Sequence, residues 1–148
     1  DSWGAMLASG RIATACGSRK GQGMAATIQG GPVVVAGAGD VGGRLARRLA
    51  AAGTEVVSLR RSAVEAGPGI RTLQADLASG RGLQALPRAC AALVFCAAPD
   101  AREEAAYRAI YVDGLRRLVD ACEAPRVLMT SSTAVYGEDA GEWVDEAT

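Results

Sequence analysis

The 148-residue sequence contains no histidine, and Lys20 is its single lysine. Without histidine, the chain has no Ser-His-Asp or Cys-His nucleophile, no histidine-bound zinc and no histidine proton shuttle. It also lacks an excess of either charge, because 16 Lys and Arg residues balance 16 Asp and Glu residues. A balanced chain offers no basic surface for the phosphates of a nucleic acid or for an anionic membrane. We therefore expect neither nucleic acid nor membrane as a partner.

Long apolar runs and paired cysteine motifs are missing as well. The longest uncharged apolar run, residues 89–98, is far shorter than the roughly 20 residues that a membrane-spanning helix needs. The four cysteines show no C-x-x-C spacing, and no export signal precedes them. We expect a cytoplasmic protein with reduced thiols. We expect no metal site, because Glu142, Asp145 and Glu146 are interpreted as a solvated loop.

The sequence has enough apolar residues, 49%, to form the core of one domain, and it is too short for two full domains. Residues 1–23 are rich in Gly, Ala and Ser without periodicity, and Met24 follows them. Our hypothesis is that Met24 is the natural start; a flexible tail is the alternative. We expect residues 1–29 to be a leader or disordered tail outside the fold. Residues 30–148 are expected to form one domain that is incomplete at its C-terminus.

Short apolar segments that fit strands alternate with helical patterns in the rest of the chain. Val41, Leu45 and Leu49 are spaced to share one face of a first helix, with Gly53 as its C-cap. The alternation predicts an α/β fold with a parallel, doubly wound sheet, truncated after the fifth strand. The fifth strand is apolar enough to be buried on both faces. The expected strands are residues 33–36, 55–59, 71–75, 92–97 and 126–130.

A second long helix is expected between the fourth and fifth strands. Asp100 and Glu103 fit a capping box at its start, and Pro125 marks its end. Its apolar stripe consists of Tyr107, Tyr111, Leu115, Leu118 and Cys122.

The turn between the first strand and first helix contains three glycines. The segment Gly37-Ala38-Gly39-Asp40-Val41-Gly42 fits the pattern G-x-G-x-x-G. In this context the first glycine permits a tight turn, the second lets a pyrophosphate approach the backbone, and the third lets helix and strand pack closely. The alternative is a plain glycine-rich turn. We predict a Rossmann-type dinucleotide site whose cofactor-binding residues in this turn are Gly37, Gly39, Asp40, Val41 and Gly42.

Two arginines at the end of the second strand indicate which dinucleotide is preferred. An Asp or Glu at this place binds the ribose 2′-hydroxyl of NAD, whereas an arginine accommodates the 2′-phosphate of NADP. This chain has Arg60 and Arg61, whose guanidinium groups suit a phosphate. We therefore expect NADP to be preferred over NAD. The alternative is that both arginines are simply solvated on a loop.

At the fifth strand, the run Thr130-Ser131-Ser132-Thr133-Ala134-Val135-Tyr136-Gly137 resembles the extended or atypical short-chain dehydrogenase/reductase superfamily, particularly its NAD-dependent epimerase/dehydratase group. The resemblance spans residues 33–148. It implies that Asp76 and Leu77 contact adenine and that Ala97 and Ala98 line the cofactor. The chain departs from the family at Tyr111, where the family has asparagine, and at Ala36, where extended members have a first glycine.

The resemblance also implies a catalytic role for Ser132, with Thr133 as the second candidate. A hydroxyl there would donate to a carbonyl or accept from an alcohol during hydride transfer. The alternative is that these hydroxyls satisfy local backbone groups. The family's Tyr-x-x-x-Lys motif is absent from these 148 residues, and Tyr136 is interpreted as a packing residue of the turn.

Together these features predict an NAD(P)-dependent oxidoreductase that acts on a secondary alcohol or carbonyl, with sugar nucleotides as one substrate class. The expected partners are the dinucleotide and a small-molecule substrate. The resemblance implies a homodimer for the full-length protein. Two alternatives stay open: a non-catalytic, NADP-sensing regulator on the same fold, and an inactive fragment.

Overall fold

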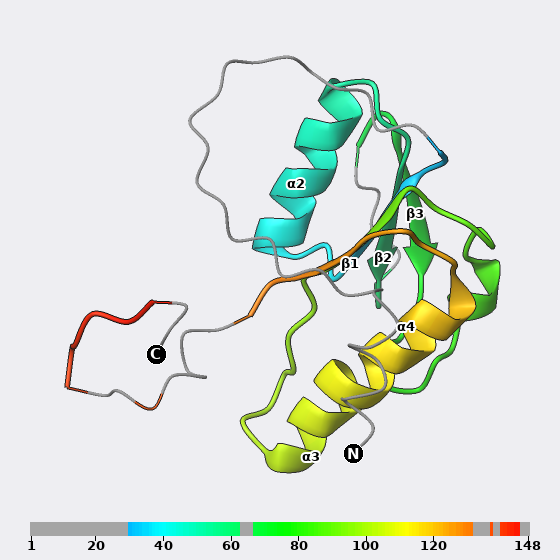
Figure 1. Cartoon of the computed structure of the whole chain (residues 1–148). Helices are drawn as coiled ribbons and strands as arrows, with labels where there is room; N and C mark the ends of the chain where they lie inside the picture. Colours follow the sequence, from blue (N-terminus) through cyan, green and yellow to red (C-terminus); the bar gives the residue numbers. More distant parts are fainter. Residues whose placement is uncertain (1–29, 63–66, 132–136, 138–139, 146–148) are drawn as a thin grey trace.

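A single parallel sheet forms the centre of the molecule (Figure 1). The computed structural model describes residues 30–62, 67–131, 137 and 140–145. Its strand order is β3-β2-β1-β4-β5, so the chain crosses from one side of β1 to the other between β3 and β4. This is the order of a Rossmann-type sheet, and the predicted fold class is confirmed. The strands are β1 (Val33–Ala36), β2 (Val56–Arg60), β3 (Ile70–Gln74), β4 (Ala92–Phe95) and β5 (Val127–Met129).

The central strand β1 is fully enclosed. It pairs with β2 on one side and with β4 on the other, and each of its four residues is at most 1% exposed. A strand between two helical layers needs apolar side chains on both faces, which explains the continuous run of valines. The carboxyl ends of β1, β2 and β4 consequently lie at one edge of the sheet.

Helices cover both faces of the sheet (Figure 1). Helix α2 (Asp40–Ala51) packs on the face that carries Val33 and Val35. The opposite face carries Val34 and Phe95, and its apolar cluster includes residues from the helical segments of that side. The segments on this side are η1 (Leu83–Ala85), α3 (Glu104–Tyr107), the π-helical turn η2 (Arg108–Gly114) and α4 (Leu115–Ala121). Segment α3 contributes no residue to the cluster, and Tyr107 of the predicted apolar stripe is 45% exposed.

Helix α2 ends as predicted but does not bury all of its predicted face. Gly53 follows the helix with a φ of +82°, and its N–H donates to the carbonyl of Ala50 at 3.0 Å, a left-handed helix end. Leu45 and Leu49 pack partly against the sheet, whereas Val41 is 61% exposed. At Val41 the shared face extends beyond the sheet, and this residue lines a cleft instead.

The second long helix differs from its prediction in two respects. It is interrupted by the π-helical turn η2, which brings Gly114 against Leu77. The predicted capping box is wrong: α3 begins at Glu104, no side chain caps it, and the carboxylate of Asp100 binds Arg61 instead.

Strand β5 is less buried than its composition predicts. Val127 is buried, but Leu128 is 43% exposed and Met129 is 39% exposed. The prediction of burial on both faces is wrong because, among the described strands, β5 has a neighbour only on its β4 side. Within the described residues, no helix is both long and apolar enough to cross a membrane.

Candidate functional site

A cleft of about 760 Å³ opens at the carboxyl ends of β1, β2, β3 and β4. In an open α/β sheet this is the crevice in which ligands bind, beside the strand where the order reverses. The structure brings ten of the predicted site residues to its walls. They are Gly37, Gly39, Asp40, Val41, Arg60, Arg61, Asp76, Leu77, Ala97 and Ala98.

Two glycines of the turn allow close packing behind the cleft. Gly37 has a φ of +89°, and a Cβ built on it would overlap with the backbone N and Cα of Ala97. Gly42 is buried outside the cleft lining, and a Cβ there would overlap with the carbonyl oxygen of Gly37 and lie 3.2 Å from the Cβ of Cys96. Both positions therefore require glycine so that β1, β4 and α2 can come together.

The middle glycine faces the cleft itself. Gly39 is exposed, and a Cβ built there would meet no atom within 4 Å. It is the N-cap of α2 and provides no side-chain hydrogen bond to the first turn. The first N–H groups of a helix have no partner within the helix, and they carry the positive end of its dipole. The turn therefore leaves an open, uncapped helix N-terminus at the floor of the cleft.

Asp40 adds a carboxylate beside this helix end, and an arginine of the same helix balances its charge. The Nε atom of Arg44 lies 2.9 Å from Oδ1 of Asp40, one turn further along α2. This ion pair compensates part of the negative charge that would otherwise repel an anion from the turn.

The wall formed after β2 and β3 is polar and charged. Arg60, Arg61 and Asp76 line it. The side chain of Gln74 fixes the backbone here, because its Nε2 donates to the carbonyl of Arg61 at 2.9 Å. The guanidinium of Arg61 makes a two-pronged ion pair with Asp100, in which the distance from Nη2 to Oδ1 is 2.8 Å.

The carboxylate of Asp76 stabilises the turn that follows β3. It accepts the Ser79 hydroxyl at 2.6 Å and the N–H of Ala78 at 3.0 Å. The Ser79 hydrogen bond, more than any other interaction, lowers the pKa of Asp76. Arg117 of α4 donates to the carbonyl of Ala78 at 2.7 Å and fastens the same turn from the other side.

The opposite wall is formed by residues that follow β4. Ala97 and Ala98 line it as predicted, together with Cys96 and with Ile110 of η2. Cys96 is half-buried, and desolvation raises the pKa of its thiol. Cys96 packs partly against the core and also lines the cleft.

Six residues of the cleft lining were not predicted as site residues, namely Ala38, Leu59, Ser62, Ala75, Cys96 and Ile110. Asp100, which pairs with Arg61 beside the cleft, was expected only as a helix cap. Ile110 reaches the wall because of the π-helical turn, for which we found no sequence signal. Asp100 had a weak signal, since it follows β4 as Arg61 follows β2, and both strands end at the same edge of the parallel sheet. The predicted catalytic residues Ser132 and Thr133 lie outside the described residues, so their prediction stays untested.

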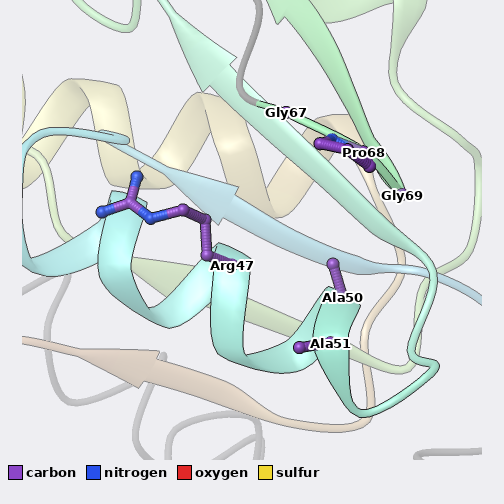
Figure 2. Close-up of a pocket in the computed structure, with 6 residues that line it drawn as sticks. All are labelled: Arg47, Ala50, Ala51, Gly67, Pro68 and Gly69. Carbon is purple, nitrogen blue, oxygen red and sulfur yellow. The ribbon is translucent and has the colours of Figure 1, made fainter.

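A second hollow, of about 400 Å³, lies between the end of α2 and residues 67–69 (Figure 2). Ala50, Ala51 and the Gly67-Pro68-Gly69 segment line it, together with Arg47. Figure 2 shows the Arg47 side chain extending away from the two alanines. No predicted site residue lines this hollow, so the first cleft is the candidate site.

Comparisons with known proteins agree with this geometry. The model of the NAD dependent epimerase/dehydratase family matches residues 33–148. A protein from Methylobacillus flagellatus that is classed as an NAD-dependent epimerase/dehydratase is 42% identical, with a TM-score of 0.62 over 80% of this chain. A short-chain dehydrogenase/reductase superfamily protein from Agrobacterium tumefaciens, solved with bound NAD, is 26% identical, with a TM-score of 0.62 over 76% of this chain.

The chain spans less than half the length of these two relatives, covering 43% of the first and 36% of the second. No match was found among the curated proteins.

Proposed function

Because this chain belongs to the NAD dependent epimerase/dehydratase family of the short-chain dehydrogenase/reductase superfamily, we propose that its cleft binds a nicotinamide dinucleotide. The whole protein would use that cofactor as an oxidoreductase of the epimerase/dehydratase type. The substrate class is a secondary alcohol or carbonyl, such as that of a sugar nucleotide.

The open glycine at the N-terminus of α2 carries this proposal. A pyrophosphate needs backbone N–H donors, positive potential and no side chain in the way. Gly39 leaves that space free, and the uncapped first turn of α2 supplies the donors. The residues present therefore fit the diphosphate of a dinucleotide. Asp40 and Val41 would contribute their backbone N–H groups, while Gly37 and Gly42 would maintain the shape of the turn.

The two walls of the cleft would hold the two ends of the cofactor. On the β2–β3 side, Arg60 and Arg61 would face the adenosine ribose, and Asp76 and Leu77 would contact adenine. Two guanidinium groups favour a 2′-phosphate, so NADP is the preferred cofactor and NAD the alternative.

The wall after β4 would hold the other end of the cofactor through the backbone of Ala97 and Ala98. Since Cys96 lies on the same wall, its thiol would also face the bound dinucleotide. This side of the cleft is close to the end of β5, after which Ser132 and Thr133 follow in the sequence.

For the reaction, the bound dinucleotide supplies or accepts a hydride. The hydroxyl of Ser132 would donate a hydrogen bond to the substrate carbonyl oxygen, or accept one from the substrate alcohol. Thr133 is the second candidate for this role. A protein that binds the cofactor without turning over any alcohol would be a dinucleotide-sensing regulator instead.

The test is a titration of the protein with NADPH and NADH, followed by cofactor fluorescence. We expect saturable binding, tighter for NADPH. The variant Gly39→Ala should fold normally, because its Cβ has free space, but should lose affinity at least tenfold, because that Cβ lies where the diphosphate must approach the backbone.

The matched control is Gly43→Ala, on the same helix. Its Cβ would make ordinary contact with the carbonyl oxygen of Ala38 at 3.4 Å, and Gly43 does not line the cleft. We expect this variant to keep its affinity. Equal affinities for wild type and Gly39→Ala would contradict the proposed site, and the absence of saturable binding to either cofactor would refute the proposed function.

A further inference from the structure

An ion pair connects the two walls of the cleft. Arg61 follows β2, and Asp100 follows β4. Strand β1 lies between β2 and β4, so the pair crosses above the carboxyl end of β1, on the side where the glycine turn begins. Nη1 of Arg61 donates to Oδ2 of Asp100 and Nη2 donates to Oδ1, a bidentate arrangement that is the strongest geometry for this kind of pair.

The ion pair determines where the charge of Arg61 is held. Hydrogen bonding to Asp100 raises the pKa of Arg61 and lowers the pKa of Asp100. Asp76 also acts on Arg61 electrostatically from the end of β3, but more weakly than Asp100 does. The guanidinium is therefore drawn toward the β4 wall and away from the β2–β3 wall, while Arg60 remains at the end of β2.

We propose that Asp100 is a specificity-determining residue: its carboxylate competes with the 2′-phosphate of the cofactor for the Arg61 guanidinium and so reduces the preference for NADP over NAD. This inference rests on the proposed function. A cofactor without the 2′-phosphate leaves the Arg61–Asp100 pair intact. A cofactor that carries it gains Arg61 only when the ion pair opens.

The exposure of the pair makes such an exchange feasible. The Arg61 and Asp100 side chains are 64% and 68% exposed, and ion pairs this exposed contribute little to stability. A phosphate monoester carries more charge than a carboxylate and also accepts both arms of a guanidinium. The 2′-phosphate can therefore displace Asp100, and the binding free energy of the cofactor is reduced by the free energy of breaking the Arg61–Asp100 ion pair.

A double-mutant cycle tests the competition. The wild type, Asp100→Asn, Arg61→Met and the double variant are titrated with NADP⁺ and with NAD⁺ by calorimetry. We expect Asp100→Asn to tighten NADP⁺ binding by about two- to fivefold, the range that an exposed pair allows, and to leave NAD⁺ binding unchanged. In the Arg61→Met background, Asp100→Asn should have no effect on either cofactor.

A charge control separates competition from a general change in electrostatic potential. Asp120→Asn removes the same charge from an exposed position on α4, outside the cleft lining. It should change neither affinity. Asp100→Ser serves as a second variant and should behave like Asp100→Asn.

Two results would overturn the inference while leaving the proposed function intact. One is that wild type and Asp100→Asn bind both cofactors with the same NADP⁺ to NAD⁺ affinity ratio. The other is that the gain from Asp100→Asn persists in the Arg61→Met background. A wild type that binds neither cofactor would instead refute the proposed function itself.

Discussion

The three described cysteines, Cys90, Cys96 and Cys122, lie in environments that give their thiols different reactivity. Cys90 and Cys122 are 2% and 1% exposed at the base of the β4 side of the molecule, whereas Cys96 lines the cleft. Desolvation raises the pKa of Cys90 to about 12, with a further contribution from its hydrogen bond to Cys122. Because the thiolate is the reactive form, Cys90 should be nearly inert at neutral pH.

These environments predict an order of alkylation. Among the three described cysteines of the folded protein at about pH 8, we expect iodoacetamide to modify Cys96 first, and Cys90 and Cys122 only after unfolding in urea. NADPH should slow the modification of Cys96, because that thiol lines the proposed cofactor site. Peptide mass spectrometry after timed quenching measures each site. Faster labelling of Cys90 than of Cys96 in the native state would contradict the structure.

At the scale of elements, Gly37 before α2 and Gly53 after it differ in how well they would tolerate a side chain. Gly37 carries a positive φ and lies directly against the backbone of Ala97, so two separate penalties oppose a side chain there. Gly53, at the other end of α2, has a similar φ of +82° but no atom within 4 Å of a built Cβ. The two glycines therefore share a backbone conformation and differ in packing.

This difference predicts two unequal stability losses. Gly53→Ala should lower the free energy of unfolding by about 1–2 kcal/mol, the cost of a left-handed conformation for a residue with a side chain. Gly37→Ala should cost at least about 2 kcal/mol more, because β1 and β4 must also move apart. Urea denaturation of both variants measures the difference. Equal losses would show that the backbone of Ala97 can move away from the added Cβ without lowering the free energy of unfolding.

Much of this element pattern was predictable from the sequence because it depends on local signals. The apolar run of β1, the glycine turn and the left-handed end of α2 at Gly53 each follow from neighbouring residues, and the structure contains all three; the phosphate-binding role of the turn stays a prediction. The strand bounds differ by only a residue or two, as hydrogen-bond ladders rather than composition decide where a strand ends.

Other features depend on contacts between distant segments and could not be derived locally. Asp100 satisfies the capping pattern, yet Arg61 lies beside it in space and its charge attracts the carboxylate more strongly than a helix end does. The π-helical turn ends at Gly114, which packs closely against Leu77 from a distant part of the chain. The burial of β5 depends on which elements flank it, which the composition of a single strand does not reveal.

At the scale of the whole molecule, two carboxylates have a lowered pKa in the folded state and so give the stability a pH dependence in acid. The pKa of Asp76 is lowered chiefly by the Ser79 hydroxyl, and the pKa of Asp100 is lowered chiefly by Arg61. A lowered pKa in the folded state contributes stability that is present above the pKa of the unfolded state. That contribution disappears as the pH falls through the folded-state value.

Removing the Ser79 hydroxyl therefore has a pH-dependent effect. Ser79→Ala should lower the free energy of unfolding at pH 7 by about 0.5 kcal/mol, given solvent screening at this partly exposed site. The gap from wild type should narrow as the pH falls below the ordinary Asp76 value of 3.8. Urea denaturation across this range measures the gap. Ser62→Ala is the control and should show a constant difference; a constant gap for Ser79→Ala would contradict the assigned cause.

The position of β1 in the middle of the sheet also governs the order in which the protein folds. Val33 pairs with Val56 and with Ala92. The central strand can therefore complete its pairing only after β2 and then β4, which follow it in the chain, have been synthesised. Contacts between segments that are distant in the sequence form slowly, because the entropy of closing the loop is lost before the pairing contributes any stability. The glycine turn is thus synthesised early, but the opposite wall of the cleft forms only when β4 pairs with β1. The cleft between the glycine turn and residues 96–98 therefore takes shape only after β4 has joined the sheet.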